Sequence, residues 1–105
     1  MNALKRHPLA KGDIESNARW YEDRRPGLGD EFLDEVHHVF EAIRENPFRF
    51  GIRFNQWRRA NLKRFPFAVF FQVIKNEVVV FAVLYSRREH ETILEQRVPK
   101  EKKAS

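Results

Sequence analysis

The chain has 105 residues and no cysteine, which excludes disulfides, thiol catalysis and cysteine-ligated zinc sites. It carries 20 Lys and Arg against 15 Asp and Glu, for a formal net charge of +5 and an isoelectric point near 9.9. The length suits one small domain, and an apolar fraction of 42% favours a folded chain. No apolar run approaches the roughly 20 residues that span a bilayer, and no signal-peptide core begins the chain, so we expect a cytoplasmic protein.

Positive charge is concentrated in the second part of the chain. Residues 1–43 have a net charge of −3, whereas residues 44–105 have a net charge of +8. Between Arg44 and Arg64 there are seven basic residues and a single acid, Glu45. This distribution indicates an anionic partner, either nucleic acid or an acidic protein segment, and the alternative is a solubilising surface.

Two helices are predicted in the first half of the chain, after a short strand at residues 3–8. The first helix begins at about Ala10 and places Ile14, Ala18 and Tyr21 on one stripe. The proline and glycines of residues 26–29 end it and permit a reversal. A second helix is predicted over residues 30–46, with an apolar stripe of Phe32, Val36, Val39, Phe40 and Ile43. The two helices form an antiparallel hairpin that can cover one face of a sheet.

Polar residues of the second helix are interpreted as surface groups. Acidic residues enrich its first two turns, where they suit the helix dipole and form a solvated face: Asp30, Glu31, Asp34 and Glu35. His37 and His38 are neighbours that point about 100° apart on a helix, so they cannot chelate one ion together. Neither a metal site nor a cofactor is predicted.

The centre of the predicted fold is a β-hairpin made of two apolar runs, residues 65–74 and 78–85. Val, Phe and Tyr dominate both runs, and Asn76 suits a tight turn between them. Neither run alternates cleanly between apolar and polar residues, so apolar side chains occur on both faces of each strand. This predicts strands that are covered on both faces. Residues 57–64 are predicted as another strand, after a connection at residues 48–56. Residues 89–98 fit either a helix or a strand. We expect a single domain of residues 1–98, followed by a charged tail at residues 99–105.

Basic residues bracket the central hairpin. If its strands pair antiparallel, Arg87 and Arg88 return beside the start of the first strand, near Lys63 and Arg64. The candidates for binding an anionic target or an acidic partner are therefore Arg58, Arg59, Lys63, Arg64, Arg87 and Arg88. The structural alternative is that the arginines of this set pair with Glu89, Glu91 or Glu95, or with acidic residues of a partner protein; these arginines are Arg59, Arg64, Arg87 and Arg88.

Five sequence elements occur in a distinctive order and spacing between Leu9 and Leu94. They are DIESNARWYE, PGLGDEFLDEV, the dipeptide NP at residues 46–47, RRANLKRFPFAVFFQV and VVVFAVLYSRR. Together they resemble the RelE/ParE superfamily of bacterial toxins from type II toxin–antitoxin modules. The resemblance implies an α+β fold of order β-α-α-β-β-β, with an α-helical hairpin packed on a bent antiparallel sheet. It also implies a cognate antitoxin whose chain masks the working surface of the toxin.

The superfamily divides by target, and the resemblance implies different site residues for each branch. RelE-like members cut messenger RNA on the ribosome, whereas ParE-like members inhibit DNA gyrase and are not nucleases. Under the ribonuclease pattern, Arg59 and Arg88 fall on basic positions that bind the scissile phosphate, and His90 could supply the C-terminal acid. Three other positions of that pattern carry changed residues: Asn61, Ala68 and Leu94.

The expected function is that of a growth-inhibiting toxin neutralised by its antitoxin, with DNA gyrase or an unassigned molecule as the target. One alternative is a ribosome-dependent messenger RNA interferase, which would make the protein an endoribonuclease. The alternative from another class is a basic nucleic-acid-binding module without toxicity.

Overall fold

The computed structural model describes residues 3–87 and 89–98. Strand β1 (Ala3–Arg6) leads into two long helices, α1 (Pro8–Arg24) and α2 (Leu28–Glu45). A 3-10 turn and four strands follow before a short C-terminal helix: Pro47–Arg49, β2 (Ile52–Phe54), β3 (Trp57–Asn61), β4 (Phe67–Ile74), β5 (Glu77–Tyr85) and α3 (His90–Arg97). Within the described ranges, no helix combines the length and the apolar character that crossing a membrane requires.

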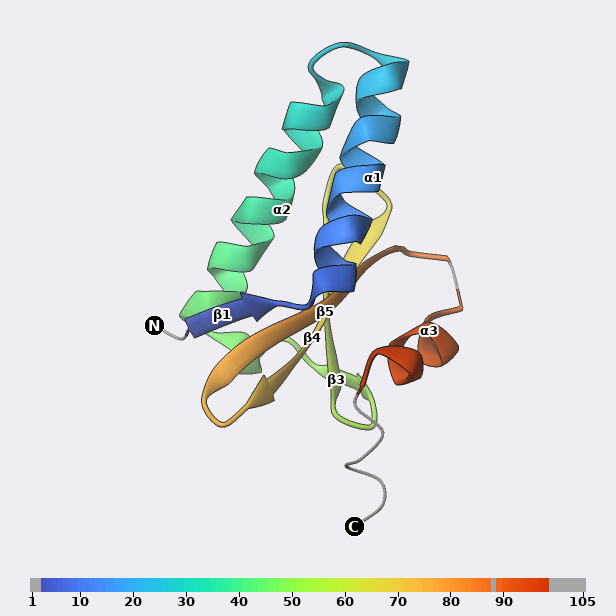
Figure 1. The fold of residues 1–105 in the computed structure, drawn as a ribbon. Coiled ribbons are helices and arrows are strands. Elements are labelled where there is room, and N and C mark those ends of the chain that lie inside the picture. Colours follow the sequence, from blue (N-terminus) through green and yellow to red (C-terminus); the bar gives the residue numbers. More distant parts are fainter. Residues whose placement is uncertain (1–2, 88, 99–105) are drawn as a thin grey trace.

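The described strands form one five-stranded sheet in the order β1-β5-β4-β3-β2. All neighbours pair antiparallel except β1, which runs parallel to β5 from Ala3 opposite Glu77 to Arg6 opposite Val80. The sheet is therefore mixed rather than wholly antiparallel. The predicted α+β fold, with a helical hairpin packed on the sheet, is confirmed (Figure 1).

Both faces of the sheet are covered, as the apolar runs predicted. The helical hairpin packs on one face, where Phe67, Val69 and Phe71 of β4 join the larger core. Ala68 and Phe70 point to the other face, where Leu94 of α3 is fully buried. Figure 1 shows α3 beside the sheet and apart from the helical hairpin. Residues 90–97 are thus a helix, which settles the alternative that the sequence left open.

The hairpin of β4 and β5 contains a tight turn and a bulge. Lys75 and Asn76 have φ angles of 51° and 67°, as a two-residue type I′ turn requires. Further along, Phe70 pairs with Ala82 but Phe71 pairs with Val80, so β5 carries one extra residue. A bulge of this kind bends the strand and increases its twist, which fits the expected bent sheet.

Several boundaries differ from the predictions. β3 ends at Asn61 rather than at residue 64, and β4 begins at Phe67 rather than at residue 65. Between them the chain makes a tight loop, because Leu62 N donates to Phe67 O and Phe67 N donates to Phe65 O. The predicted connection at residues 48–56 also contains a strand, β2. Both long helices begin two residues earlier than predicted, α1 at Pro8 and α2 at Leu28.

Candidate functional site

The predicted basic residues lie in separate places rather than in one cluster. Arg58 is half-buried on β3 and donates from Nη1 to the Phe50 carbonyl oxygen at 2.7 Å. Its guanidinium carbon lies 5.1 Å from the centroid of the Phe48 ring. Arg58 therefore fastens the connection after α2 to the sheet, and its hydrogen bond is to a carbonyl rather than to a carboxylate.

Arg59 and His90 contact the same aromatic ring, that of Phe70. The Arg59 guanidinium carbon lies 5.4 Å from the ring centroid, and the His90 ring centroid lies 4.6 Å from it. Arg59 Nε donates to Asn61 Oδ1 at 2.9 Å. His90 Nε2 lies 3.0 Å from the carbonyl oxygen of Tyr85, and since a carbonyl only accepts, Nε2 carries the proton. The structure thus brings together two of the three predicted catalytic candidates.

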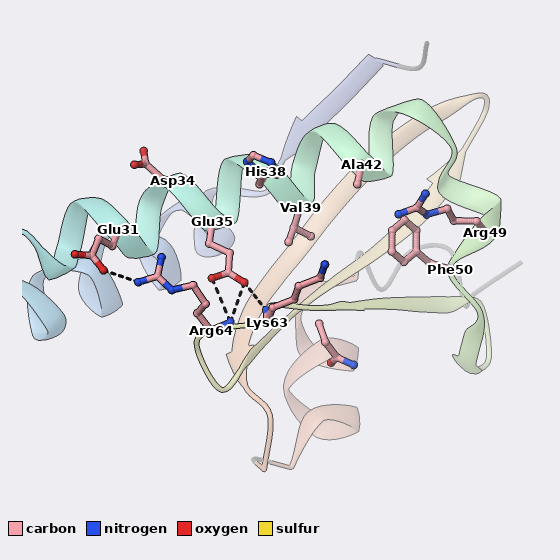
Figure 2. Close-up of a pocket in the computed structure, with 11 residues that line it drawn as sticks. Glu31, Asp34, Glu35, His38, Val39, Ala42, Arg49, Phe50, Lys63 and Arg64 are labelled. Carbon is pink, nitrogen blue, oxygen red and sulfur yellow. Dashed lines mark hydrogen bonds and ion pairs between the residues drawn. The ribbon is translucent and has the colours of Figure 1, made fainter.

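Lys63 and Arg64 lie in the β3–β4 loop and are held by acidic residues of α2 (Figure 2). The Glu35 carboxylate accepts from the backbone N–H groups of Lys63 and Arg64, the latter at 3.0 Å. The Arg64 side chain donates to Glu31, and this hydrogen bond holds the pKa of Glu31 below its ordinary value. Glu31 and Glu35, which the sequence places on a solvated face, therefore also position the basic loop.

A groove of about 530 Å³ runs beside this loop, between α2 and the end of β3. Figure 2 shows Glu35 pointing from α2 toward the loop, with Phe50 and Arg49 at the opposite end. The groove is lined by the charged groups just described and by Val39, Ala42 and Phe50. A surface with both signs of charge and an apolar floor suits a protein segment better than a nucleic-acid backbone.

Arg87 follows β5 and is exposed. Ser86 N donates to Pro66 O at 2.8 Å, so the chain does return beside the start of β4, as predicted. The side chain of Arg64 pairs with Glu31 and not with the acids of residues 89–95 that the structural alternative named. Arg88 lies outside the described residues.

Sequence reasoning missed an ion pair between Asp13 of α1 and Arg97 of α3. Arg97 Nη1 lies 2.7 Å from Asp13 Oδ2, and Nη2 lies 3.2 Å from Oδ1. The two side chains are only 15% and 12% exposed. The pair joins residues 84 positions apart, and such a contact leaves no periodic signal in the sequence.

Comparison with known proteins identifies the family. A family model described as the ParE toxin of a type II toxin–antitoxin system matches residues 4–90. The chain belongs to the ParE toxin family. A solved chain described as part of a chromosomal ParDE system from P. aeruginosa has the same fold, with a TM-score of 0.71. It is 17% identical and the match covers 79% of this chain and 94% of that chain. Comparison with curated protein sequences gave no match.

This member of the ParE toxin family lacks several groups of the ribonuclease pattern. Ala68 and Leu94 are 0% exposed in the apolar core between the sheet and α3. Asn61 stands at the third changed position, and its side-chain oxygen is engaged by Arg59. No group of three or more His, Asp or Glu that could hold a metal ion occurs within residues 3–87 and 89–98.

Proposed function

We propose that this protein is the growth-inhibiting toxin of a type II toxin–antitoxin module, that a cognate antitoxin neutralises it, and that DNA gyrase is its target. Membership of the ParE toxin family supports the toxin role. The solved chain that shares this fold belongs to a two-component ParDE system, which supports an antitoxin partner for this chain as well.

The burial of Ala68 and Leu94 is the observation that favours gyrase over messenger RNA. At these positions the ribonuclease pattern has an Arg and a Tyr, and here both residues are fully buried and apolar. A methyl group and an isobutyl group can neither stabilise a phosphate nor transfer a proton. Cleavage would have to rely on the few remaining polar groups, whereas binding to gyrase requires no catalytic group.

The test is to express the protein alone in a bacterial host, follow growth, and assay the purified protein in a gyrase supercoiling reaction. We expect growth arrest and inhibition of supercoiling, and co-expression of the antitoxin encoded beside the toxin should restore growth. The 5′ ends of a translated messenger should not change. Arrest with unaffected supercoiling would contradict the gyrase target, and normal growth at confirmed expression would contradict the toxin role.

The second candidate function is a ribosome-dependent messenger RNA interferase, and the shared contact of Arg59 and His90 with Phe70 favours it. With Nε2 donating to Tyr85, the neutral form of His90 keeps Nδ1 as a proton acceptor, and Arg59 supplies a cation against the same Phe70 ring. New 5′ ends at codon boundaries, present only when the message is translated, would identify this activity. They should disappear in the Arg59→Ala and His90→Ala proteins, with circular dichroism confirming that both proteins fold.

A further inference from the structure

A second cavity lies between α1 and the last part of β5, where the sheet leaves a strand edge open. Its volume is about 330 Å³, which falls in the size range of small-molecule sites. β1 pairs with β5 only as far as Val80, so no described strand lies beside residues 83–85 of β5 on that side. These residues line the cavity together with one side of α1.

The open edge of β5 presents one backbone acceptor and one backbone donor beside this cavity. Ser86 N donates to Pro66 O on the side of β4, so alternation along the strand turns the backbone groups of Val83 and Tyr85 away from β4. Val83 N already donates to Asp13 Oδ2 at 3.0 Å. The Val83 carbonyl oxygen and the Tyr85 N–H have no hydrogen bond to any described residue. A ligand with a donor beside an acceptor can satisfy both groups at once.

Aromatic side chains border the same cavity and offer surface to a planar ring. Trp20 and Tyr85 both line it and remain 50% and 40% exposed. Tyr21 also lines it, and burial raises the pKa of its hydroxyl, with the neighbouring Tyr85 raising it further. The Tyr21 hydroxyl therefore stays protonated and can donate a hydrogen bond. A flat ring with a polar edge fits this combination of aromatic walls and free backbone groups.

The polar side chains of the cavity can accept hydrogen bonds from the hydroxyl groups of a sugar. Asn17 Nδ2 donates to Asp13 O at 2.8 Å, which leaves Asn17 Oδ1 as an acceptor. Ser16 Oγ donates to the same carbonyl oxygen at 3.4 Å and can also accept. Asp13 is the one acid of the described lining, and Arg97 neutralises it. The site therefore suits a neutral base and sugar.

We propose that this cavity binds the base and ribose of a free purine nucleoside or nucleoside monophosphate. The Val83 carbonyl oxygen accepts from the exocyclic amino group of adenine, and the Tyr85 N–H donates to the adjacent ring nitrogen. The ring stacks against the aromatic side chains of the cavity, as bases do on exposed aromatic residues of other proteins. The ribose hydroxyls face Asn17 and Ser16. The site goes beyond the toxin role and requires no assumption about the target.

Two larger ligands fit this cavity less well. An added β-strand would need a longer row of free backbone groups, but Val83 N is used by Asp13 and Tyr85 O lies 3.0 Å from His90 Nε2. A nucleic-acid strand would need cations along its phosphates, and the described lining contains no Lys or Arg. A single base with its sugar needs neither feature.

The test measures binding to the purified full chain by calorimetry, with adenosine, AMP and 6-dimethylaminopurine riboside as ligands. The last compound differs from adenosine only in that methyl groups replace both amino hydrogens. We expect adenosine and AMP to bind and the dimethylated nucleoside to bind about tenfold more weakly or less, because the Val83 carbonyl then has no donor. Tighter binding of AMP than of adenosine would place the phosphate near Arg24, whose guanidinium carbon lies 3.8 Å from the Trp20 ring centroid.

A pair of variants tests the aromatic wall. Trp20→Ala removes an exposed stacking surface of the cavity and should weaken adenosine binding by about tenfold. The matched control is Phe48→Ala, which removes an aromatic side chain that is 62% exposed and lies outside this cavity, and which should leave binding unchanged. Circular dichroism confirms that both proteins fold.

Four results would overturn the proposal. They are no binding of adenosine or AMP, equal binding of the dimethylated nucleoside, equal effects of the two variants, and tighter binding of a short oligoadenylate than of AMP. The outcome is separable from the proposed function, because calorimetry involves neither growth nor supercoiling. Growth arrest without nucleoside binding would keep the toxin role and reject this site, whereas nucleoside binding without arrest would do the reverse.

Discussion

His7 joins the first strand to the first helix through both its backbone and its ring. Its N–H donates to the Val80 carbonyl oxygen at 2.8 Å, and its Nδ1 accepts from Leu9 N at 3.0 Å as the cap of α1. Burial lowers the pKa of His7, the charge of Arg97 lowers it further, and Asp13 acts in the opposite direction. The cap requires a neutral ring, because a protonated Nδ1 cannot accept a hydrogen bond.

The free energy of unfolding should therefore decrease as the pH falls through the range in which His7 takes up a proton. The folded pKa lies below the ordinary value of 6.5, so the unfolded chain binds the proton first. The contribution of the neutral His7 ring to the free energy of unfolding is fully present above pH 6.5, and it is lost as the pH falls toward the lower pKa of His7 in the folded chain. Loss of a helix cap costs about 1 kcal/mol. Urea titrations at a series of pH values measure this.

Two variants isolate the effect of His7 from that of other groups. His7→Asn keeps a side-chain acceptor at the cap but does not titrate in this range, so the decrease should be smaller by about the same 1 kcal/mol. His37→Asn removes an exposed histidine of α2 and should leave the decrease unchanged. An identical pH dependence in the His7→Asn protein would show that the cap does not carry it.

At the scale of elements, the turn between α1 and α2 depends on two glycines for different reasons. Gly27 has a φ of +91°, which side-chain-bearing residues rarely adopt. A Cβ on Gly29 would lie 2.7 Å from the backbone oxygen of Ala18 and 3.0 Å from Glu22 Oε1. The Glu22 carboxylate accepts hydrogen bonds from the N–H groups of both glycines, and so provides partners for backbone donors at the start of α2 that have none within the helix. The helices can approach this closely only because residue 29 has no side chain.

Gly29→Ala should destabilise the protein although alanine is the better helix former. The new methyl group meets a backbone carbonyl of α1, which cannot move without shifting the helix, and overpacking of this kind costs about 1–3 kcal/mol. The matched control is Gly12→Ala in α1, where a Cβ would have no atom within 4 Å apart from the adjacent residues and the backbone of its own helix. That variant should gain up to about 1 kcal/mol from helix propensity alone. Equal shifts of the urea midpoint in the two proteins would contradict the role of close approach.

The elements that the sequence predicts well are those long enough to show a regular pattern of apolar residues or to contain a characteristic turn residue. The stripe from Phe32 to Ile43 identifies α2, and Asn76 marks the turn of the central hairpin. The parallel direction of β1 was not predictable, because the alternation of side chains is the same in either direction. β2 was missed because three residues are too few to show a period, and α3 stayed undecided because it buries only Leu94 fully.

The candidate site was predictable in its residue types but not in its arrangement. The positions of the charged residues in the sequence identify the basic segment and show that an acidic part of the chain precedes a basic part. The partners of those charges are set by the packing of α2 against the β3–β4 loop, which joins Glu31 to Arg64 across 33 positions. Arg49 and Arg53 belong to that basic segment, but their lack of an acid partner among the described residues becomes visible only in the folded chain.

At the scale of the whole molecule, the ion pair of Asp13 and Arg97 joins three parts of the fold. β1 pairs with β5 only as far as Arg6 opposite Val80. Beyond that point, the side chains of Asp13 and Arg97 form hydrogen bonds with the backbone of β5. Arg97 Nη1 donates at 2.9 Å to the carbonyl oxygen of Phe81, the extra residue of the bulge, and Asp13 Oδ2 accepts at 3.0 Å from Val83 N, two residues further along β5. The pair thus links α1 and α3 through the bulged part of β5.

Helix α3 has eight residues and depends on this link for its position. A helix so short is not stable alone, so its order comes from tertiary contacts. Arg97→Ala should leave Asp13 partly buried without its cation and cost about 2–4 kcal/mol. Amide hydrogens of α3 should then exchange faster than those of α2, because local release is easier than global unfolding. Hydrogen exchange followed by mass spectrometry measures both segments in one experiment.

A double-mutant cycle separates the coupling of this pair from the cost of each substitution. Asp13→Ala with Arg97→Ala should cost less than the sum of the two single changes, with a coupling energy of about 1–3 kcal/mol. The control cycle uses Lys5 and Glu77, an ion pair between β1 and β5 whose side chains are 67% and 41% exposed. Solvent screening should hold its coupling below about 1 kcal/mol. Equal coupling in the two cycles would mean that partial burial of the Asp13–Arg97 pair adds nothing to its coupling energy.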